Sequence, residues 1–282
     1  MNRVAVMVLL ICAVSAGITQ AGGDEQGGET YVLIVSGIIR EPSERMAKER
    51  VVSTLRDYFL NHCRVEPKRL FLVTDKHSSA RTDSQSSSAE SLRKTIQSLA
   101  RQIKPEDRFI LYYAGQANVV AKKLRLNLPG KDITHLQLAD WLNPIKAPSI
   151  LVVLDCPGAG LAIKDIAGRG RIVLGACTGE QHYSTRFGEY FVGSLTDSES
   201  DADGDRRVSL LEAFTRTSQQ LDDWYRQRHL LTTETPVLED NGDGTASPRP
   251  WKWKQSGEDG MIASQFFLST QRLKEVVRES EE

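Results

Sequence analysis

The sequence predicts an α/β fold, a three-layer sandwich with a mostly parallel central sheet. Five short apolar runs, rich in β-branched residues and bounded by turn or polar residues, are typical of strands buried in such a sheet. Amphipathic helical segments separate them, and strands that alternate with helices form parallel sheets with right-handed crossovers. The length of 282 residues allows one large domain or two small ones.

The elements follow from the spacing of apolar residues along the chain. Strands are predicted at Tyr31–Gly37, Arg69–Thr74, Arg108–Ala114, Ser149–Asp155 and Gly170–Ala176. A helix is predicted after Pro42, with an apolar face made of Met46, Val51, Leu55, Tyr58 and Phe59. A second helix is predicted after a capping box, Ser87 with Glu90, and its face carries Leu92, Ile96, Leu99 and Ile103.

The remaining elements are shorter or less regular. The polar, serine-rich stretch His77–Ser88 is predicted to be a loop, and Lys123–Leu128 a small edge ribbon. Further helices are predicted at Thr134–Leu142, Phe187–Leu195 and Ser209–Arg228. The apolar face of the last one is predicted to consist of Leu211, Phe214, Leu221 and Trp224.

The N-terminal residues differ in character from the rest of the chain. In residues 1–21, Arg3 precedes the apolar stretch Val4–Ala16 and small residues follow, which is the pattern of a secretory signal peptide. The apolar stretch is too short to span a bilayer comfortably. Residues 22–29 are glycine-rich and predicted to be a flexible linker. We therefore expect an exported protein, secreted or periplasmic, with no membrane span after signal cleavage.

The residues after the linker are expected to form one α/β domain, residues 30–244, and an extension, residues 245–282, packed on it. The apolar run Phe266–Leu268 is the reason to expect the extension to dock. Trp251 and Trp253 either pack against the domain or belong to a recognition surface.

Three cysteines remain beyond the predicted signal peptide, Cys63, Cys156 and Cys177. In an oxidising compartment one disulfide could form, and Cys156 with Cys177 is the candidate pair because both close apolar strands. Three unpaired thiols are the alternative, since an odd number of cysteines cannot all pair within one chain.

Several functional classes have no support in the sequence. A formal net charge of −1 provides no electrostatic case for binding nucleic acid. The turn after the first strand, VSGIIREPSE, matches neither a dinucleotide fingerprint nor a P-loop, and there is no G-x-S-x-G nucleophile elbow.

Two strand ends remain, YYAGQA at Tyr112–Ala117 and LDCPGAG at Leu154–Gly160. In open α/β sheets, sites form at the carboxyl ends of the strands. With the segments Leu126–Leu142 and Thr233–Gly244, these ends make the chain resemble the caspase-like cysteine peptidases, which include caspases, metacaspases and legumains. It is most similar to legumain-type bacterial relatives, and the resemblance covers roughly Thr30–Gly244.

The resemblance implies a caspase-like fold in which the catalytic dyad is lost. The family histidine would fall on Gln116, and glutamine cannot act as a general base. The nucleophilic cysteine would fall on Pro157, which has no nucleophile. No catalytic residue is therefore expected at these degenerate positions, and the enzyme hypothesis is disfavoured.

A fallback reading keeps an active site one residue earlier, with Cys156 as nucleophile and His182 or His135 as base. Successive side chains of a strand point to opposite faces, so the Cys156 thiol is expected to point away from the cleft. A lone loop histidine such as His182 is more often a solvated surface residue.

The segment DADGDRRVSLLE, residues 201–212, matches the twelve-residue calcium loop of an EF-hand. The ligands in loop order would be Asp201, Asp203, Asp205, Arg207 through its backbone carbonyl, Ser209 and Glu212. Arg206 replaces the glycine of position six, where positive φ costs a non-glycine residue on the order of 1 kcal/mol. Weakened calcium binding is expected; the alternative is a solvated acidic loop that caps a helix.

A further acidic patch, Glu239–Gly244, is too short for a full loop of this kind. Asp240, Asn241 and Asp243 either ligate a cation or form a glycine-rich turn.

These observations predict an exported caspase/legumain-like pseudopeptidase that binds Ca²⁺ at residues 201–212 and acts by binding a protein or peptide. The alternative is a divergent, active cysteine endopeptidase that uses Cys156.

Overall fold

The computed structural model describes residues 28–74, 85–252 and 257–273 of the chain. Its core is a seven-stranded sheet in the order β10-β9-β8-β4-β1-β2-β3. Neighbouring strands are parallel, except that β10 runs antiparallel to β9. The strands are β1 Thr30–Ser36, β2 Leu70–Thr74, β3 Gln85–Ser86, β4 Arg108–Ala114, β8 Ser149–Asp155, β9 Arg171–Gly175 and β10 Val237–Glu239.

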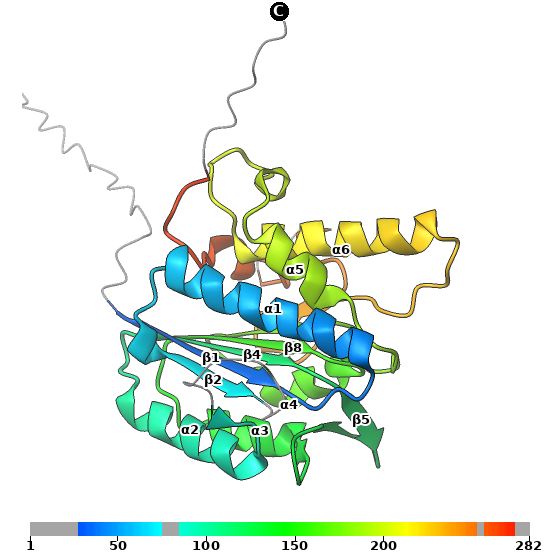
Figure 1. The fold of residues 1–282 in the computed structure, drawn as a ribbon. Coiled ribbons are helices and arrows are strands. Elements are labelled where there is room, and N and C mark those ends of the chain that lie inside the picture. Colours follow the sequence, from blue (N-terminus) through cyan, green and yellow to red (C-terminus); the bar gives the residue numbers. More distant parts are fainter. Residues whose placement is uncertain (1–27, 75–84, 253–256, 274–282) are drawn as a thin grey trace, which may run out of the picture.

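Helices cover both faces of the sheet, which confirms the predicted three-layer α/β architecture. Figure 1 shows α1, α5 and α6 on one face and α2, α3 and α4 on the other. The helices are α1 Pro42–Asn61, α2 Ala89–Gln102, α3 His135–Leu142, α4 Ile163–Ile166, α5 Phe187–Ser194 and α6 Leu210–Gln227. Each face has its own apolar core, so the sheet is buried on both sides as a parallel sheet requires.

The predicted edge ribbon is part of a small antiparallel sheet in the order β5-β6-β7. Its strands are β5 Ala117–Val120, β6 Lys123–Leu126 and β7 Ile133–Thr134. Leu124 and Leu126 of β6 are buried, and the residues between and beside them are exposed, so the ribbon packs one face on the domain. This sheet begins directly after β4 and lies beside its carboxyl end.

The alternation of side chains along β8 decides the geometry of the site. Leu151 and Val153 lie in the core under α1 and α5, whereas Val152 and Leu154 lie in the core over α2 and α3. Continuing the pattern, Asp155 belongs to the α1 face and Cys156 to the opposite core.

Five local predictions needed correction. Gln85–Ser86, within the predicted loop His77–Ser88, form the short strand β3 beside β2. The N-cap of α2 is Ser88, whose Oγ accepts the N–H of Ser91, and not Ser87. Met46 is 55% exposed, and Lys48 takes the corresponding buried place on α1. The short strand β10 was not predicted, because three residues carry too little periodicity. Trp224 is only half-buried on α6.

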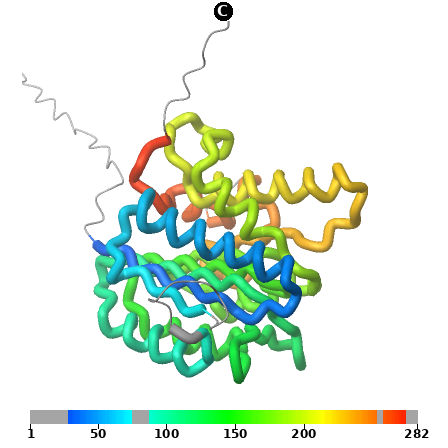
Figure 2. Tube along the Cα trace, in the orientation of Figure 1, coloured from blue at the N-terminus to red at the C-terminus, as the bar shows by residue number. Residues whose placement is uncertain are grey.

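Trp251 packs against Phe214 of α6, with ring centroids 6.4 Å apart, as the packing alternative predicts. The extension docks as expected through Phe266, whose carbonyl accepts the N–H of Leu210 at 2.8 Å. Figure 2 shows this last described segment on the same side of the sheet as α5 and α6.

Some predictions lie outside the described residues: the signal peptide at 1–21, most of the linker at 22–29, residues 77–84 of the serine-rich loop, Trp253 and the end of the extension. In the described ranges, Cys63, Cys156 and Cys177 are all free thiols, so the candidate disulfide is absent. None of the helices in these ranges is both long and apolar enough to cross a bilayer.

Candidate functional site

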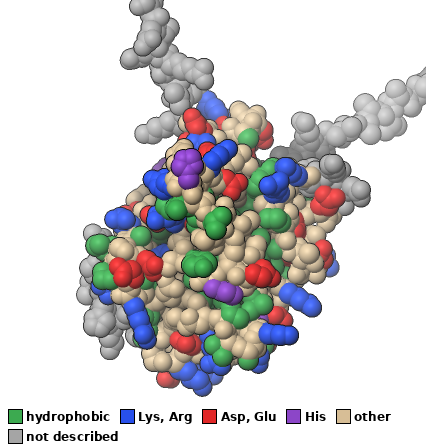
Figure 3. All heavy atoms as spheres, turned by 90° about the vertical axis from the view of Figure 1, so that its right-hand side faces the viewer, with side chains coloured by type: hydrophobic (Ala, Val, Ile, Leu, Met, Phe, Trp, Pro, Cys, Tyr) green, Lys and Arg blue, Asp and Glu red, His purple; other side chains and the backbone are tan. Residues whose placement is uncertain are grey.

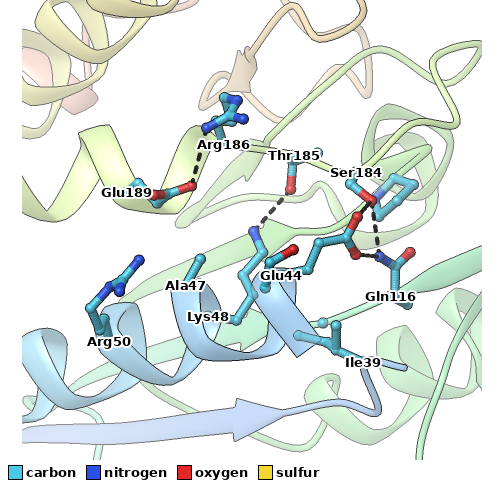
Figure 4. A pocket seen from close by; sticks show the side chains of 13 residues that line it. Ile39, Glu44, Ala47, Lys48, Arg50, Gln116, Ser184, Thr185, Arg186 and Glu189 are labelled. Atoms are coloured by element: carbon cyan, nitrogen blue, oxygen red, sulfur yellow. Dashed lines mark hydrogen bonds and ion pairs between the residues drawn. The ribbon is translucent and has the colours of Figure 1, made fainter. Parts of the chain in front are cut away.

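A cleft of about 260 Å³ opens at the carboxyl ends of β4 and β8, under the first two turns of α1 and beside the start of α5. Figure 4 shows the side chains that converge on it. The lining residues are Ile39, Ser43, Glu44, Ala47, Lys48, Arg50, Gly115, Gln116, Pro157, Ser184, Thr185, Arg186 and Glu189. The edge at which it opens is where parallel sheets place their sites.

A buried ion pair forms the floor of the cleft. The Lys48 ammonium of α1 lies 2.5 Å from Oδ1 of Asp155, and the two side chains are 8% and 0% exposed. Thr185 donates its hydroxyl to the same oxygen at 2.8 Å and accepts from Lys48 at 3.0 Å. Tyr112 donates to Oδ2 of Asp155 at 3.2 Å. Both carboxylate oxygens of Asp155 and the ammonium of Lys48 therefore have hydrogen-bond partners. A buried charge is costly without such partners.

The elements around Asp155 are packed closely enough to exclude a larger residue on α5. A Cβ placed on Gly188 would lie 2.2 Å from Oδ2 of Asp155 and 2.8 Å from the Tyr112 hydroxyl. Burial and the neighbouring carboxylate raise the pKa of Tyr112 well above its ordinary value, so the phenol keeps the proton that it donates.

A second hydrogen-bonded group lies at the mouth of the cleft. Gln116 donates Nε2 to Oε2 of Glu44 at 2.6 Å and to Oγ of Ser184 at 3.1 Å. Ser184 in turn donates its hydroxyl to Oε1 of Glu44. Figure 4 shows these contacts joining α1, the turn after β4 and the segment before α5.

The structure brings Gln116 and Pro157 together, because both line the cleft. Among its described lining residues there is neither a cysteine nor a histidine. Cys156 is fully buried in the core on the opposite face, and burial raises the pKa of its thiol well above the ordinary value, with Cys177 adding to the effect. The buried position and the raised pKa of Cys156 therefore argue against its use as an exposed thiolate nucleophile.

The two candidate histidines are not part of the cleft either. His182 is exposed, and its Nδ1 would lie 3.3 Å from a Cβ placed on Gly158, so it sits beside the turn after β8. His135 is buried, with Nε2 3.0 Å from Oδ2 of Asp165 and Nδ1 3.1 Å from the N–H of Leu124. His135 thus holds α3 to β6 and α4.

Sequence reasoning missed the residues that contact Asp155 and Gln116, namely Lys48, Glu44, Ser184 and Thr185. One signal was available for Lys48. It lies three, four and seven residues before Val51, Val52 and Leu55, which is the buried stripe of α1. A lysine on such a stripe needs an acidic partner, and Asp155 was the acid at the end of the central strand.

A buried acid, Glu234, accepts backbone hydrogen bonds from the residues at the start of α5. Glu234 is 1% exposed, and its carboxylate accepts the backbone N–H groups of Arg186 and Phe187 at 2.8 and 3.2 Å. The Tyr225 hydroxyl donates to the same group at 3.3 Å. The pKa of Glu234 is raised to about 7, mainly by burial and also by the nearby Asp155, and the N–H donors oppose the rise.

The acidic loop between α5 and α6 gathers its first three predicted ligands. Oxygens of Asp201, Asp203 and Asp205 lie within 4.8 Å of one another. Asp201 accepts the N–H groups of Gly204 and Arg206, both at 2.9 Å, which folds the loop around this carboxylate. Arg206 adopts φ 68°, the positive value that position six of a calcium loop requires.

The later predicted ligands are arranged differently. Glu212 accepts the N–H groups of Ala202 and Ser209 at 2.9 and 2.8 Å, and with Ser209 it forms a capping box at the start of α6. Glu212 is not in the group of mutually close carboxylates. Arg207 donates its N–H to Asp205 at 2.7 Å, and its guanidinium lies 3.7 Å from the ring centroid of Phe267. Three carboxylates on one loop fit a hard cation such as Ca²⁺.

The second acidic patch is built as a turn. Asp240 accepts the N–H groups of Gly260 and Ala263 at 3.0 and 2.7 Å, and Asp243 accepts that of Thr245 at 2.6 Å. These contacts hold the extension to the end of β10, in agreement with the glycine-rich-turn alternative.

No protein-family model matches the sequence, and no curated protein matches it. Among solved structures, the fold is similar to that of caspase-1 from Spodoptera frugiperda, with a TM-score of 0.47 and 9% sequence identity. The alignment covers 76% of this chain and 86% of that chain. At this TM-score and identity nothing is carried over from that protein, and the chemistry of the cleft is read from its own residues.

The Lys48→Met variant tests the ion pair. It leaves Asp155 charged and buried, which should lower the free energy of unfolding by about 3–5 kcal/mol at pH 7 in urea titrations. Adding Asp155→Asn should recover much of the loss. In the control Lys68→Met, where the lysine is 72% exposed, the loss should stay below about 1 kcal/mol. Equal, small losses in both variants would contradict the role of the pair.

The Glu234→Gln variant tests the raised pKa. The folded protein binds this proton more tightly than the unfolded chain, so the stabilisation is complete below pH about 4.5 and is lost as the pH rises through about 7. Urea unfolding between pH 5 and 8 should show a smaller loss of stability in the variant than in the wild type. Asp259, whose pKa is also raised to about 7, contributes equally to both proteins. The exposed-site control Glu180→Gln should keep the wild-type pH dependence.

Proposed function

We propose that the protein is an exported, caspase-like peptidase homologue without peptidase activity, and that its cleft binds a peptide or protein segment. One observation carries the proposal. The described lining of the cleft holds neither a cysteine nor a histidine, and its most buried cation, Lys48, is committed to Asp155. Thiol chemistry needs an accessible thiolate with a base in hydrogen-bond reach.

The cleft retains what binding requires. Arg50 and Glu189 lie at its rim with Arg186, and the amide oxygen of Gln116 offers an acceptor at the mouth. An extended peptide presents carbonyl and N–H groups that such donors and acceptors can pair. Because the ion pair fixes α1 against β8, the walls are preformed, which reduces the entropy lost on binding.

The alternative, an endopeptidase that uses Cys156, would need the strand end to rotate. The thiol and the Asp155 carboxylate point to opposite faces of the sheet. A rotation that exposed Cys156 to the cleft would therefore turn the Asp155 carboxylate into the opposite apolar core and break its ion pair with Lys48. We retain it only as the rival that the first experiment below tests.

We further propose that residues 201–212 bind Ca²⁺, with Asp201, Asp203 and Asp205 as the principal ligands. The gathered carboxylates support this, and the positive φ of Arg206 already provides the required turn. The loop is tied to the extension, because the Arg206 carbonyl accepts the N–H of Leu273 at 2.7 Å and Ser209 pairs with Phe267. Calcium there would hold the start of α6 and the extension together. The proposed export would expose the loop to millimolar calcium.

The absence of peptidase activity is tested with fluorogenic peptides that carry Asp, Asn, Lys or Arg before the scissile bond. We expect no cleavage by the wild-type protein. Cleavage that disappears in Cys156→Ala would show that the rival is correct.

Iodoacetamide labelling provides the matched control for geometry. Native wild-type protein should not be alkylated at Cys156, whereas Pro157→Cys, one residue later and lining the cleft, should be alkylated faster at the new thiol than at Cys156. Mass spectrometry locates the label.

Calcium binding is tested by titration calorimetry. We expect the wild type to bind with a dissociation constant on the order of 10⁻⁴–10⁻³ M, typical of extracellular sites. Asp203→Ala removes one of three ligating carboxylates and should weaken binding at least about tenfold. The control Asp222→Ala, an exposed acid on α6, should bind as the wild type does. Identical binding heats for Asp203→Ala and the wild type would contradict the proposed calcium site.

A further inference from the structure

A second hollow, which we call the side groove, opens next to the cleft at the end of α6. It encloses about 700 Å³ and shares Glu44, Ser184 and Arg186 with the cleft. Its other main lining residues are Tyr183, Trp224, His229, Leu230 and Leu231. A single ligand could therefore extend from the cleft into the side groove.

Large apolar side chains stand exposed around the side groove. Tyr183 is 68% exposed, Leu230 51% and Leu231 88%. Single exposed leucines are ordinary, but three large apolar side chains around one concavity are typical of an interaction site. Contact with an apolar side chain would bury them.

Two arginines contact Trp224, which lines the side groove. The guanidinium groups of Arg186 and Arg228 lie 4.1 and 4.7 Å from the ring centroid of Trp224. Arg186 is partly neutralised by Glu189 at 3.8 Å, whereas Arg228 has no carboxylate partner among the described residues. Figure 3 shows a face whose upper part carries basic and acidic side chains around a histidine, with hydrophobic side chains below them. The facing acid, Glu44, is committed to Gln116 and Ser184.

The wall that carries Leu230 and Leu231 is fixed by hydrogen bonds. The N–H of Leu230 donates to the Tyr225 carbonyl at 3.0 Å and that of His229 to the Arg226 carbonyl at 3.1 Å, which is the Schellman pattern. His229 occupies the left-handed position at φ 53°, where glycine is preferred by about 1 kcal/mol. The chain thus keeps a basic side chain at a position that favours glycine.

We propose that the side groove binds a segment of a partner protein in which a large apolar residue is flanked by aspartates or glutamates. The apolar residue packs on Tyr183, Leu230 and Leu231. The flanking carboxylates meet Arg186, which lines the side groove, and Arg228, whose guanidinium lies over the ring of Trp224. Charge complementarity selects acidic over basic segments. This inference rests on the proposed role of the cleft as a peptide-binding site and adds the chemistry of its ligand.

Three fluorescein-labelled peptides test the proposal by fluorescence polarisation. The first has a Leu-Phe pair flanked by glutamates, the second replaces the glutamates by lysines, and the third replaces the Leu-Phe pair by serines. The full-length protein should bind the first peptide at least about tenfold more tightly than the others, and added salt should weaken this binding.

Variants locate the site. Leu231→Ser and Arg228→Glu should each weaken binding of the first peptide about tenfold, because one loses apolar contact and the other reverses the charge over Trp224. The controls Ile262→Ser and Lys68→Glu alter an exposed apolar and an exposed basic residue elsewhere and should bind as the wild type does. Equal binding of all three peptides, binding of none, or unchanged affinity in both groove variants would overturn the proposal.

Ala47→Trp, which fills the cleft, separates this inference from the proposed function. Loss of binding in Ala47→Trp alone would leave the cleft function standing and overturn the side groove. Loss of binding in Leu231→Ser and Arg228→Glu alone would support the side groove as the binding site and refute the proposal that the cleft binds the peptide. A concentration-dependent dimer in sedimentation that Leu231→Ser dissociates would identify a second copy as the occupant and overturn the proposal.

Discussion

The ion pair between Lys48 and Asp155 is the interaction on which the site depends. The two residues are 107 positions apart, and their contact joins α1 to the end of the central strand, with Thr185 and Tyr112 completing the hydrogen bonds. A buried pair of this kind contributes little net stability over an apolar pair, but removal of either partner is costly. Its effect is therefore one of position: it holds α1, β8, β4 and the segment before α5 together at one point.

The same pair determines what the cleft can do. A lysine held by a carboxylate at the floor is not free to activate a hydroxyl or to bind a substrate anion, and Gln116 and Pro157 supply neither base nor nucleophile. The Cys156 thiol follows one residue beyond Asp155, and the alternation of the strand places it in the opposite core. Since the carboxylate must face α1, the thiol cannot do so as well.

Much of the fold and part of the site could be predicted from local sequence. The bounds of β4 and β8 follow from continuous apolar runs, and the meeting of Gln116 with Pro157 follows from two parallel strands that end at one edge. Ser184 and Glu234 could not be found in this way, because their roles depend on partners distant in the sequence. Lys48 carried a local signal, its place on the buried stripe of α1. The assignment of Met46 to the buried face of α1 was wrong because a lysine with a buried partner can replace an apolar residue there.

Arg186 connects the cleft to the side groove. Its backbone N–H donates to the buried Glu234, which fixes the position of the Arg186 backbone. From there its guanidinium extends over the ring of Trp224. Glu234 follows closely on the exposed Leu230 and Leu231, and it therefore anchors both the wall of the side groove and the start of α5. Thr185, which directly precedes Arg186, contacts Asp155 at the floor of the cleft. The two hollows consequently form one continuous surface whose shape is set by two buried carboxylates, Asp155 from the sheet and Glu234 from the loop after α6.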